Sequence, residues 1–221
     1  GSPTENAGKV LNSGFEFELS YRKSINKDWR YSISANLATV NNKVVSLADG
    51  KPIPGGRIDD NVYATLTTEG QPIGEFYMLR QDGIFQNDKE VFTHAYQGPG
   101  VQAGDVKYLD VNHDGVIDQS DRQYVGSPIP KFTYGFSGTA NYKNFDLSLF
   151  FQGVYGNKIY NQILTDIEGF YRAFNITERI ANESWHGEGT SDKFPRLSWS
   201  AAQNNKQPST RFLEDGSYLR L

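Results

Sequence analysis

The sequence predicts an all-β fold, a meander of antiparallel hairpins with long loops and one or two short helices. Aromatic residues make up 14% of the 221 residues, and 22 glycines are available for turns. Aromatic side chains favour pleated sheets, so the composition favours β structure. Two stretches in which apolar and polar residues alternate, at residues 15–37 and 132–155, give the prediction its main support.

The first alternating stretch predicts a hairpin close to the N-terminus. A polar turn around residues 26–28 separates its two strands. Successive side chains of a strand point to opposite sides, so the hairpin has one apolar and one polar face. The apolar face carries Phe15, Phe17, Leu19 and Tyr21, followed by Trp29, Tyr31, Ile33, Ala35 and Leu37.

The next part of the chain is less regular. Residues 41–57 are rich in Gly and Pro and predict a long loop. Short strands are expected at residues 62–68 and 75–80, and residues 86–103 form a polar segment interrupted by Pro and Gly. This segment leads into an acidic loop.

The acidic loop has the spacing of a calcium site. Counted from Asp110, oxygen-bearing side chains occupy positions 1, 3, 5, 9 and 12, and Gly115 occupies position 6. Calcium takes six to eight oxygen ligands, which a twelve-residue loop supplies from alternate positions. Ile117 would point inward as an anchor. The candidate ligands are Asp110, Asn112, Asp114, the carbonyl of Val116, Asp118 and Asp121.

Two observations weigh on the calcium prediction. Crowded carboxylates repel one another unless a cation lies among them, which favours an ion. Position 12 is Asp121 rather than Glu, so the last ligand is one methylene shorter than usual. The alternative is a surface turn rich in Asp, Asn and Gly that holds no ion.

The second hairpin is expected over residues 131–155, with Lys143 and Asn144 as a two-residue turn. All apolar side chains then share one face. Ten residues at about 3.4 Å each, tilted by about 40°, project to roughly 25 Å, the height of the apolar band of an outer-membrane barrel. The pattern equally allows a face packed into a soluble core, and Phe150 on the polar face fits neither. The predicted pairs are Tyr142/Phe145, Ala140/Leu147, Gly138/Leu149, Phe136/Phe151 and Phe132/Tyr155.

The remaining residues predict short helices and a last strand. Tyr160, Ile163, Leu164, Ile167 and Phe170/Tyr171 follow helical spacing, and residues 177–185 allow another turn. Residues 216–221 read as a strand that stops half built. Because the chain also begins with Gly-Ser rather than Met, we expect a truncated or processed chain, without its plug domain or final strands.

Composition and motifs exclude several function classes. The net charge of −4 equals the contribution of the four Asp residues in the acidic loop, and no basic stripe suggests nucleic acid. The chain has no Cys, so neither disulfides nor a thiolate metal site can form. Its three His residues are scattered, and no phosphate loop or nucleophile motif is present. We therefore expect no enzyme.

Many short segments, in this order along the chain, resemble the SusC/RagA family of TonB-linked outer-membrane proteins of Bacteroidota. They span most of the sequence. They are residues 70–74 (GQPIG), 82–85 (DGIF), the run 104–122 from Gly104 to Arg122, Gly126, Pro128, Pro130, Phe132, 134–136 (YGF), 144–147 (NFDL), 150–153 (FFQG), 155–157 (YGN), Tyr160, Asn161, 195–196 (PR) and 215–221 (DGSYLRL).

The resemblance implies one partial segment of a large outer-membrane β-barrel over residues 1–221, with the acidic loop at 104–122 and the membrane-length hairpin at 131–155. It implies a TonB-dependent transporter that imports glycans or other nutrients, with a SusD-like lipoprotein, TonB, outer-membrane lipid, and a glycan or peptide substrate as partners. The fragment alone would not transport. Calcium would then be structural, ordering the entry into the strand at Phe132.

One reading from another class stays open at this point. The chain could be a soluble, calcium-stabilised secreted β-domain that binds glycan through exposed aromatic side chains. Dependence on detergent separates the two, because an exposed apolar sheet face aggregates in water.

Overall fold

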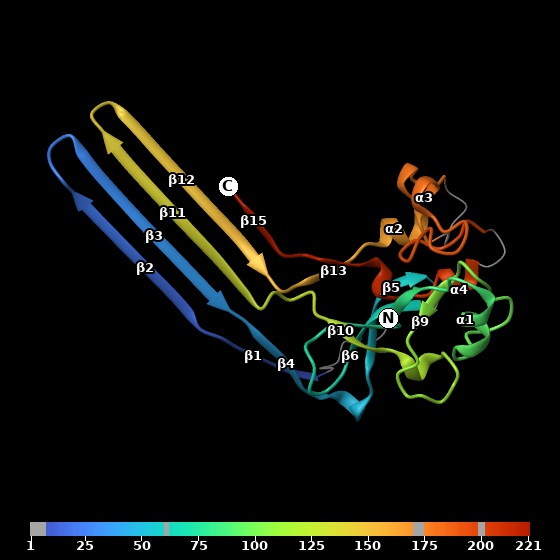
Figure 1. Cartoon of the computed structure of the whole chain (residues 1–221). Helices are drawn as coiled ribbons and strands as arrows, with labels where there is room; N and C mark the ends of the chain where they lie inside the picture. The colour runs from blue at the N-terminus through green and yellow to red at the C-terminus, as the bar shows by residue number, and fades with distance from the viewer. Residues whose placement is uncertain (1–7, 60–61, 170–174, 199–201) are drawn as a thin grey trace.

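The computed structural model describes residues 8–59, 62–169, 175–198 and 202–221, and it confirms an all-β protein (Figure 1). The strands are β1 (Gly8–Ser13), β2 (Glu16–Ser24), β3 (Trp29–Thr39), β4 (Asn41–Leu47), β5 (Ile53–Asp59), β6 (Val62–Thr67), β7 (Glu75–Met78), β8 (Gln81–Ile84), β9 (Val106–Tyr108), β10 (Gln123–Gly126), β11 (Phe132–Tyr142), β12 (Phe145–Tyr155), β13 (Lys158–Tyr160), β14 (Leu213–Asp215) and β15 (Tyr218–Arg220). All strand ladders among them are antiparallel.

The helical segments are short. They are α1 (Asp88–Thr93), α2 (Gln162–Ile167), α3 (Glu178–Glu183), α4 (Ala202–Asn205) and the 3-10 turns η1 (Ala48–Gly50), η2 (Gln119–Asp121) and η3 (Thr210–Phe212). The described residues thus contain four short α-helices where one or two were expected. None of these helices is long and apolar enough to cross a membrane.

The long sheet has the strand order β15-β12-β11-β3-β2. Its β11–β12 hairpin has the predicted register: Tyr142 lies opposite Phe145, Gly138 opposite Leu149 and Phe132 opposite Tyr155. The predicted N-terminal hairpin is present as β2 and β3. The strand expected near the C-terminus is present as β15, which pairs with β12.

The two long hairpins join through β3 and β11, which pair along eleven positions from Trp29/Tyr142 to Thr39/Phe132. Most of the remaining elements are inserted between these two strands. Residues 53–126 of this insertion and residues 158–215, which follow β12, gather into a lobe, and the long sheet projects away from it (Figure 1).

The lobe contains small sheets rather than one large one. Strands β10, β7, β6 and β5 form a four-stranded sheet, while β8 pairs with β9 and β13 with β14. One hydrophobic cluster contains Ile58, Ala64, Phe76 and Met78. A second contains Leu79, Ile84, Val106 and Tyr108. The lobe therefore carries its own core.

The predicted loop over residues 41–57 is wrong in two places. Strand β4 pairs with β1 and so extends the first hairpin. Strand β5 pairs with β6 despite containing Pro54, Gly55 and Gly56. Because β5 is an edge strand, a residue without a backbone N–H leaves the ladder intact there.

The helical predictions are partly confirmed. Helix α2 lies within the stretch expected from residue 160, although Phe170 and Tyr171 lie outside the described residues. Helix α3 lies within residues 177–185 and is capped by Thr177, whose Oγ1 accepts the N–H of Ile180 at 3.2 Å. Helix α1, capped by Asn87, occupies part of the segment 86–103 that was expected to be irregular.

Candidate functional site

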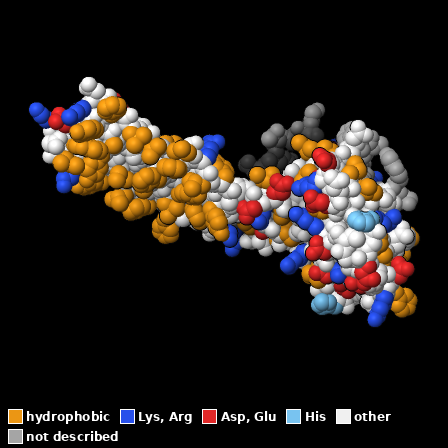
Figure 2. Space-filling model, turned by 45° about the horizontal axis from the view of Figure 1, so that its top comes forward, with side chains coloured by type: hydrophobic (Ala, Val, Ile, Leu, Met, Phe, Trp, Pro, Cys, Tyr) orange, Lys and Arg blue, Asp and Glu red, His pale blue; other side chains and the backbone are white. Residues whose placement is uncertain are grey.

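One face of the long sheet carries a continuous apolar surface, which we call the apolar band. Figure 2 shows it as hydrophobic side chains gathered along the sheet, with charged side chains at the sheet's tip and over the lobe. In the middle of the band Ile33, Gly138 and Leu149 face one another across three strands. Leu19 is 60% and Leu147 is 55% exposed. Such a face needs an apolar partner.

Aromatic rings lie at both ends of the apolar band. At the turn end, the rings of Trp29 and Tyr142 have centroids 5.1 Å apart, and the Lys143 ammonium lies 5.3 Å from the Tyr142 ring. At the lobe end, Phe132 stacks on Tyr155 with centroids 5.0 Å apart. Rings with polar tips suit the boundary between hydrocarbon and water, where one end is apolar and the other is hydrated.

The opposite face of the long sheet is polar. The hydroxyl oxygens of Ser32 and Thr139 lie 2.7 Å apart, as do those of Ser34 and Ser137. These hydrogen bonds join β3 to β11 side by side. Phe150 interrupts this polar face and is 54% exposed, as its position in the alternation predicted. The sheet therefore has one apolar face and one polar face.

The acidic loop leads from β9 to η2 and is folded around its own amides. Asp110 accepts the N–H of His113 on Oδ1 at 2.8 Å and that of Gly115 on Oδ2 at 3.0 Å. Gly115 has a φ of +84° and His113 one of +60°. The left-handed backbone explains the glycine at loop position 6, because a side chain there would be strained.

The middle of the loop is exposed and cross-linked by side chains. Asn112 donates from Nδ2 to Asp114 Oδ2 at 2.8 Å and accepts the Asp114 N–H on Oδ1 at 3.0 Å. Asp114 also accepts the N–H of Val116 at 2.9 Å. These contacts bring Asn112 and Asp114, two of the predicted calcium ligands, together in one turn.

The last two acidic residues form a cap on η2. Asp118 accepts the backbone N–H and the hydroxyl of Ser120, each at 2.7 Å, and these bonds hold the pKa of its carboxyl below the usual value. Asp121 is fully buried and accepts the N–H of Val111 and of Asp118, both at 2.9 Å. Both oxygens of the position-12 residue thus already bind amides.

The loop offers calcium the right atoms without gathering them at one point. All its candidate ligands are hard oxygens, although Asp118 Oδ1 already accepts two hydrogen bonds from Ser120. Within the described ranges, however, no three acidic or imidazole side chains lie close enough to hold one metal ion. The calcium site stays a prediction.

The loop is anchored to the lobe as its sequence suggested. Ile117 is partly buried and packs against the second hydrophobic cluster. Its N–H donates to the carbonyl of Tyr96 at 2.9 Å, and the Tyr96 N–H donates to the carbonyl of Gly115 at 2.8 Å. The loop therefore has a fixed place beside the segment that follows α1.

A buried ion pair holds the centre of the lobe together. Asp105 is fully buried, and its Oδ1 lies 2.9 Å from Arg196 Nε. Asn205 donates to the same oxygen at 3.1 Å and accepts the N–H of Val106 at 2.8 Å. The pair joins the start of β9 to two segments about a hundred residues later. A buried carboxylate needs such partners, since an unpaired charge in the interior is strongly destabilising.

A second ionic cluster supports the C-terminal half of the lobe. Arg179 NH2 lies 2.8 Å from Oε1 and 2.7 Å from Oε2 of Glu168. Arg211 donates to the backbone carbonyl of Glu168 at 2.7 Å. Burial lowers the pKa of Arg211 to about 10, so it remains charged at neutral pH.

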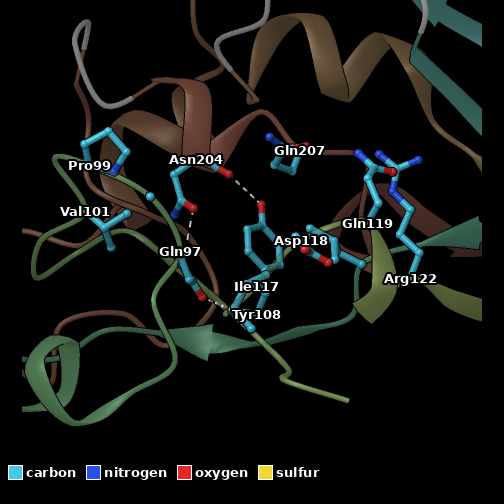
Figure 3. Close-up of a pocket in the computed structure, with 12 residues that line it drawn as sticks. Gln97, Pro99, Val101, Tyr108, Ile117, Asp118, Gln119, Arg122, Asn204 and Gln207 are labelled. Carbon is cyan, nitrogen blue, oxygen red and sulfur yellow. Dashed lines mark hydrogen bonds between the residues drawn. The ribbon is translucent and has the colours of Figure 1, made fainter. Parts of the chain in front are cut away.

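A cavity of about 200 Å³ lies between the acidic loop and the α4 region (Figure 3). On one side Asn204 accepts from Gln97 at 3.2 Å, and its backbone carbonyl accepts the Tyr108 hydroxyl at 2.7 Å. On the other side lie Gln119 and Arg122. Its polar lining consists of four side-chain amides, the Tyr108 hydroxyl, one carboxylate and one guanidinium, groups that bind polar ligands by hydrogen bonds, and apolar side chains such as Leu79 and Val101 line the rest.

Sequence reasoning identified the acidic loop and the apolar band but not the ionic clusters or the cavity. Asp105 and Arg196 were named only as part of the family resemblance. Their pairing could not be predicted, because 91 positions separate them in the sequence. The cavity combines residues from five separate segments, among them those of Gln97, Arg122 and Asn204. No local pattern marks them.

Relatives of the chain are TonB-dependent receptors, although no protein-family model matches it. TonB-dependent receptor P3 of Formosa agariphila is 32% identical over the whole chain, which covers 22% of that receptor. Receptor P26 of the same organism is 28% identical over the whole chain, again covering 22% of the relative. TonB-dependent receptor SusC of Bacteroides thetaiotaomicron is 24% identical over 74% of the chain and 16% of its own length.

The fold is also similar to solved structures of a transporter. A structure of the RagAB peptide transporter aligns over 98% of this chain and 22% of the matched chain, with a TM-score of 0.71 and 24% identity. A second, described as the RagAB peptide importer in a closed-closed state, gives a TM-score of 0.70. The chain thus spans about a fifth of the length of the proteins it matches.

Proposed function

We propose that the chain, which is similar to SusC and other TonB-dependent receptors, forms part of the barrel wall and the outer lobe of an outer-membrane transporter. The observation that carries this proposal is the apolar band with aromatic rings at both ends. Its strands β11 and β12 have eleven residues each, long enough to span a membrane when tilted.

The ends of the long sheet suggest its orientation. At the tip, β11 and β12 are joined by only Lys143 and Asn144. At the other end lies the whole lobe. Outer-membrane barrels have short turns on the periplasmic side and longer loops outside. We therefore place the tip in the periplasm and the lobe at the cell exterior.

The function proposed for the whole receptor is import of a glycan or another nutrient, including peptides, together with a SusD-like lipoprotein and with energy from TonB. The SusC relative and the fold shared with RagA support this proposal. The segment alone is not transport-competent, because an open sheet with free edges encloses no channel. Uptake of labelled cargo by cells with and without TonB, and copurification of a lipoprotein with the receptor, test it.

The rival function is a soluble, secreted glycan-binding domain. Purification without detergent decides between the two. The receptor that contains this segment should aggregate when detergent is removed and stay monodisperse when it is present. A monodisperse monomer in buffer alone would contradict the membrane assignment.

We also propose that the acidic loop binds a structural calcium ion. Its hard oxygen donors and its excess of four carboxylates support this proposal. Calorimetric titration of the receptor with calcium should give a binding heat that Asp114→Ala removes. Asp88→Ala, at the start of α1 outside the loop, is the control. Identical heats from wild type and Asp114→Ala would refute the site.

A further inference from the structure

Arg122 differs from the other partly buried arginines of the lobe. Arg196 reaches a carboxylate oxygen at 2.9 Å, and Arg211 reaches a carbonyl oxygen at 2.7 Å. The side chain of Arg122 makes no hydrogen bond or ion pair with any residue in the described part of the chain, and its Nε is buried without an acceptor. A buried donor without a partner destabilises the fold, so such a group requires a specific explanation.

Two cavities meet at Arg122. The first, of about 200 Å³, lies toward Gln97 and Asn204. The second, of about 300 Å³, is lined by Tyr63 and Tyr77 as well as Arg122. Gln119 lines both. Figure 3 shows Gln119 and Arg122 together at one end of the first cavity. The guanidinium therefore lies between two spaces that each hold a group the size of one sugar or one amino acid.

The second cavity combines a cation with a preformed aromatic surface. The rings of Tyr77 and Tyr124 have centroids 5.0 Å apart, and the Tyr124 hydroxyl donates to Thr68 Oγ1 at 2.5 Å. These contacts hold Tyr77 in place before any ligand arrives. Arginine binds carboxylates in a planar, two-pronged geometry, and a tyrosine ring packs against the apolar face of a sugar or side chain.

We propose that Arg122 binds a carboxylate of the cargo, whose adjoining residue packs against Tyr63 and Tyr77. The inference rests on the transport function proposed above and adds to it a chemical class of cargo. Asp118 also lines the first cavity, and its negative charge would repel a carboxylate there, which favours binding on the tyrosine side. The carboxylate belongs either to a uronic acid or to a peptide C-terminus.

The experiment is calorimetric titration of the full receptor in detergent with two matched pairs of probes. The first pair is trigalacturonate and its neutral methyl ester. The second is trialanine and its C-terminal amide. The charged member of one pair should bind at least about tenfold more tightly than its neutral partner, the effect of one charge-assisted bond. The pair that shows the difference identifies the source of the carboxylate.

Arg122→Gln should abolish this difference, and Arg122→Lys should retain part of it. Arg80→Gln, which changes an exposed arginine that lines neither cavity, should behave as wild type. Equal binding within both pairs, or a difference that survives in Arg122→Gln, would overturn the proposal. If the receptor stays monodisperse without detergent but still prefers the charged probe, the transporter function is refuted and the carboxylate site is not.

Thermal unfolding without ligand gives a second, independent readout. Because Arg122 Nε has no acceptor among the described residues, Arg122→Gln should unfold at the same or a higher temperature than wild type. A lower unfolding temperature would mean that another part of the receptor pairs with Arg122, and the proposal would fall.

Discussion

The long sheet and the lobe are stabilised in different ways. All thirteen buried apolar residues among the described ones belong to β4 or to the lobe, and none belongs to β2, β3, β11, β12 or β15. The lobe is held by hydrophobic clusters and by ion pairs within itself. The long sheet has ladders but no core. The stability of the long sheet therefore depends on what lies against the apolar band, whereas the stability of the lobe does not.

The largest expected effect is in the lobe. Arg196→Ala would leave the fully buried Asp105 without its cation and should lower the free energy of unfolding by about 3–5 kcal/mol. Denaturation of the receptor followed by amide hydrogen exchange measures the loss within the lobe. Arg80→Ala, an exposed change, is the control. Unchanged protection of the lobe amides would show that the buried pair does not hold it together.

The next effect is in the long sheet. Leu149→Arg places a charge near the middle of the apolar band and should cost about 2–4 kcal/mol in a bilayer. Ser148→Arg, one residue away on the polar face, should cost far less. The two variants are compared by reversible unfolding in lipid vesicles. Equal costs would contradict a sheet with one lipid face.

Thr177→Ala tests a smaller contact within the lobe. It removes the cap of α3 and a hydrogen bond to Glu168 Oε1 at 2.8 Å, so we expect a loss of about 1 kcal/mol. Thr177→Ser should recover most of the stability, because it keeps the hydroxyl. Thermal unfolding of both variants provides the measurement, and equal losses for Ala and Ser would rule out the capping role.

The smallest effect depends on pH. Hydrogen bonds from Ser217 and Lys158 lower the pKa of Asp215 from 3.8 to about 2. Because its folded pKa lies below the unfolded one, Asp215 contributes stability above about pH 4, and this is lost as the pH falls through about 2. Asp215→Asn should flatten the stability curve slightly in that window, as pH-dependent unfolding would show. Superimposable curves for wild type and Asp215→Asn would argue against the shift.

The long sheet could be predicted from the sequence better than the lobe. The register of residues 132–155 was correct at every pair because alternation and a two-residue turn are local signals. The pairing of β3 with β11 was not anticipated, since more than ninety residues separate the end of one from the start of the other. The alternation of apolar and polar residues from Phe15 to Leu37 predicts strands but does not indicate which distant strand pairs with them.

The lobe was harder to predict because its elements depend on distant partners. Strand β5 looked like a loop, since Pro54 and two glycines are tolerated only through its edge position beside β6. The acidic loop was located correctly from spacing alone, including its glycine at a φ of +84° and its anchor Ile117. Whether the loop holds calcium is a question of affinity that spacing cannot answer.

The most direct test of the account is contact between the apolar band and lipid. The chain has no Cys, so once any cysteines elsewhere in the receptor are replaced, a fluorophore can be attached at a single cysteine placed at Leu147, Ser148 or Leu149. In vesicles containing brominated lipid, the account predicts strong quenching at positions 147 and 149 and little at 148. Equal quenching at all three positions, or none, would contradict a sheet that separates lipid from an aqueous interior.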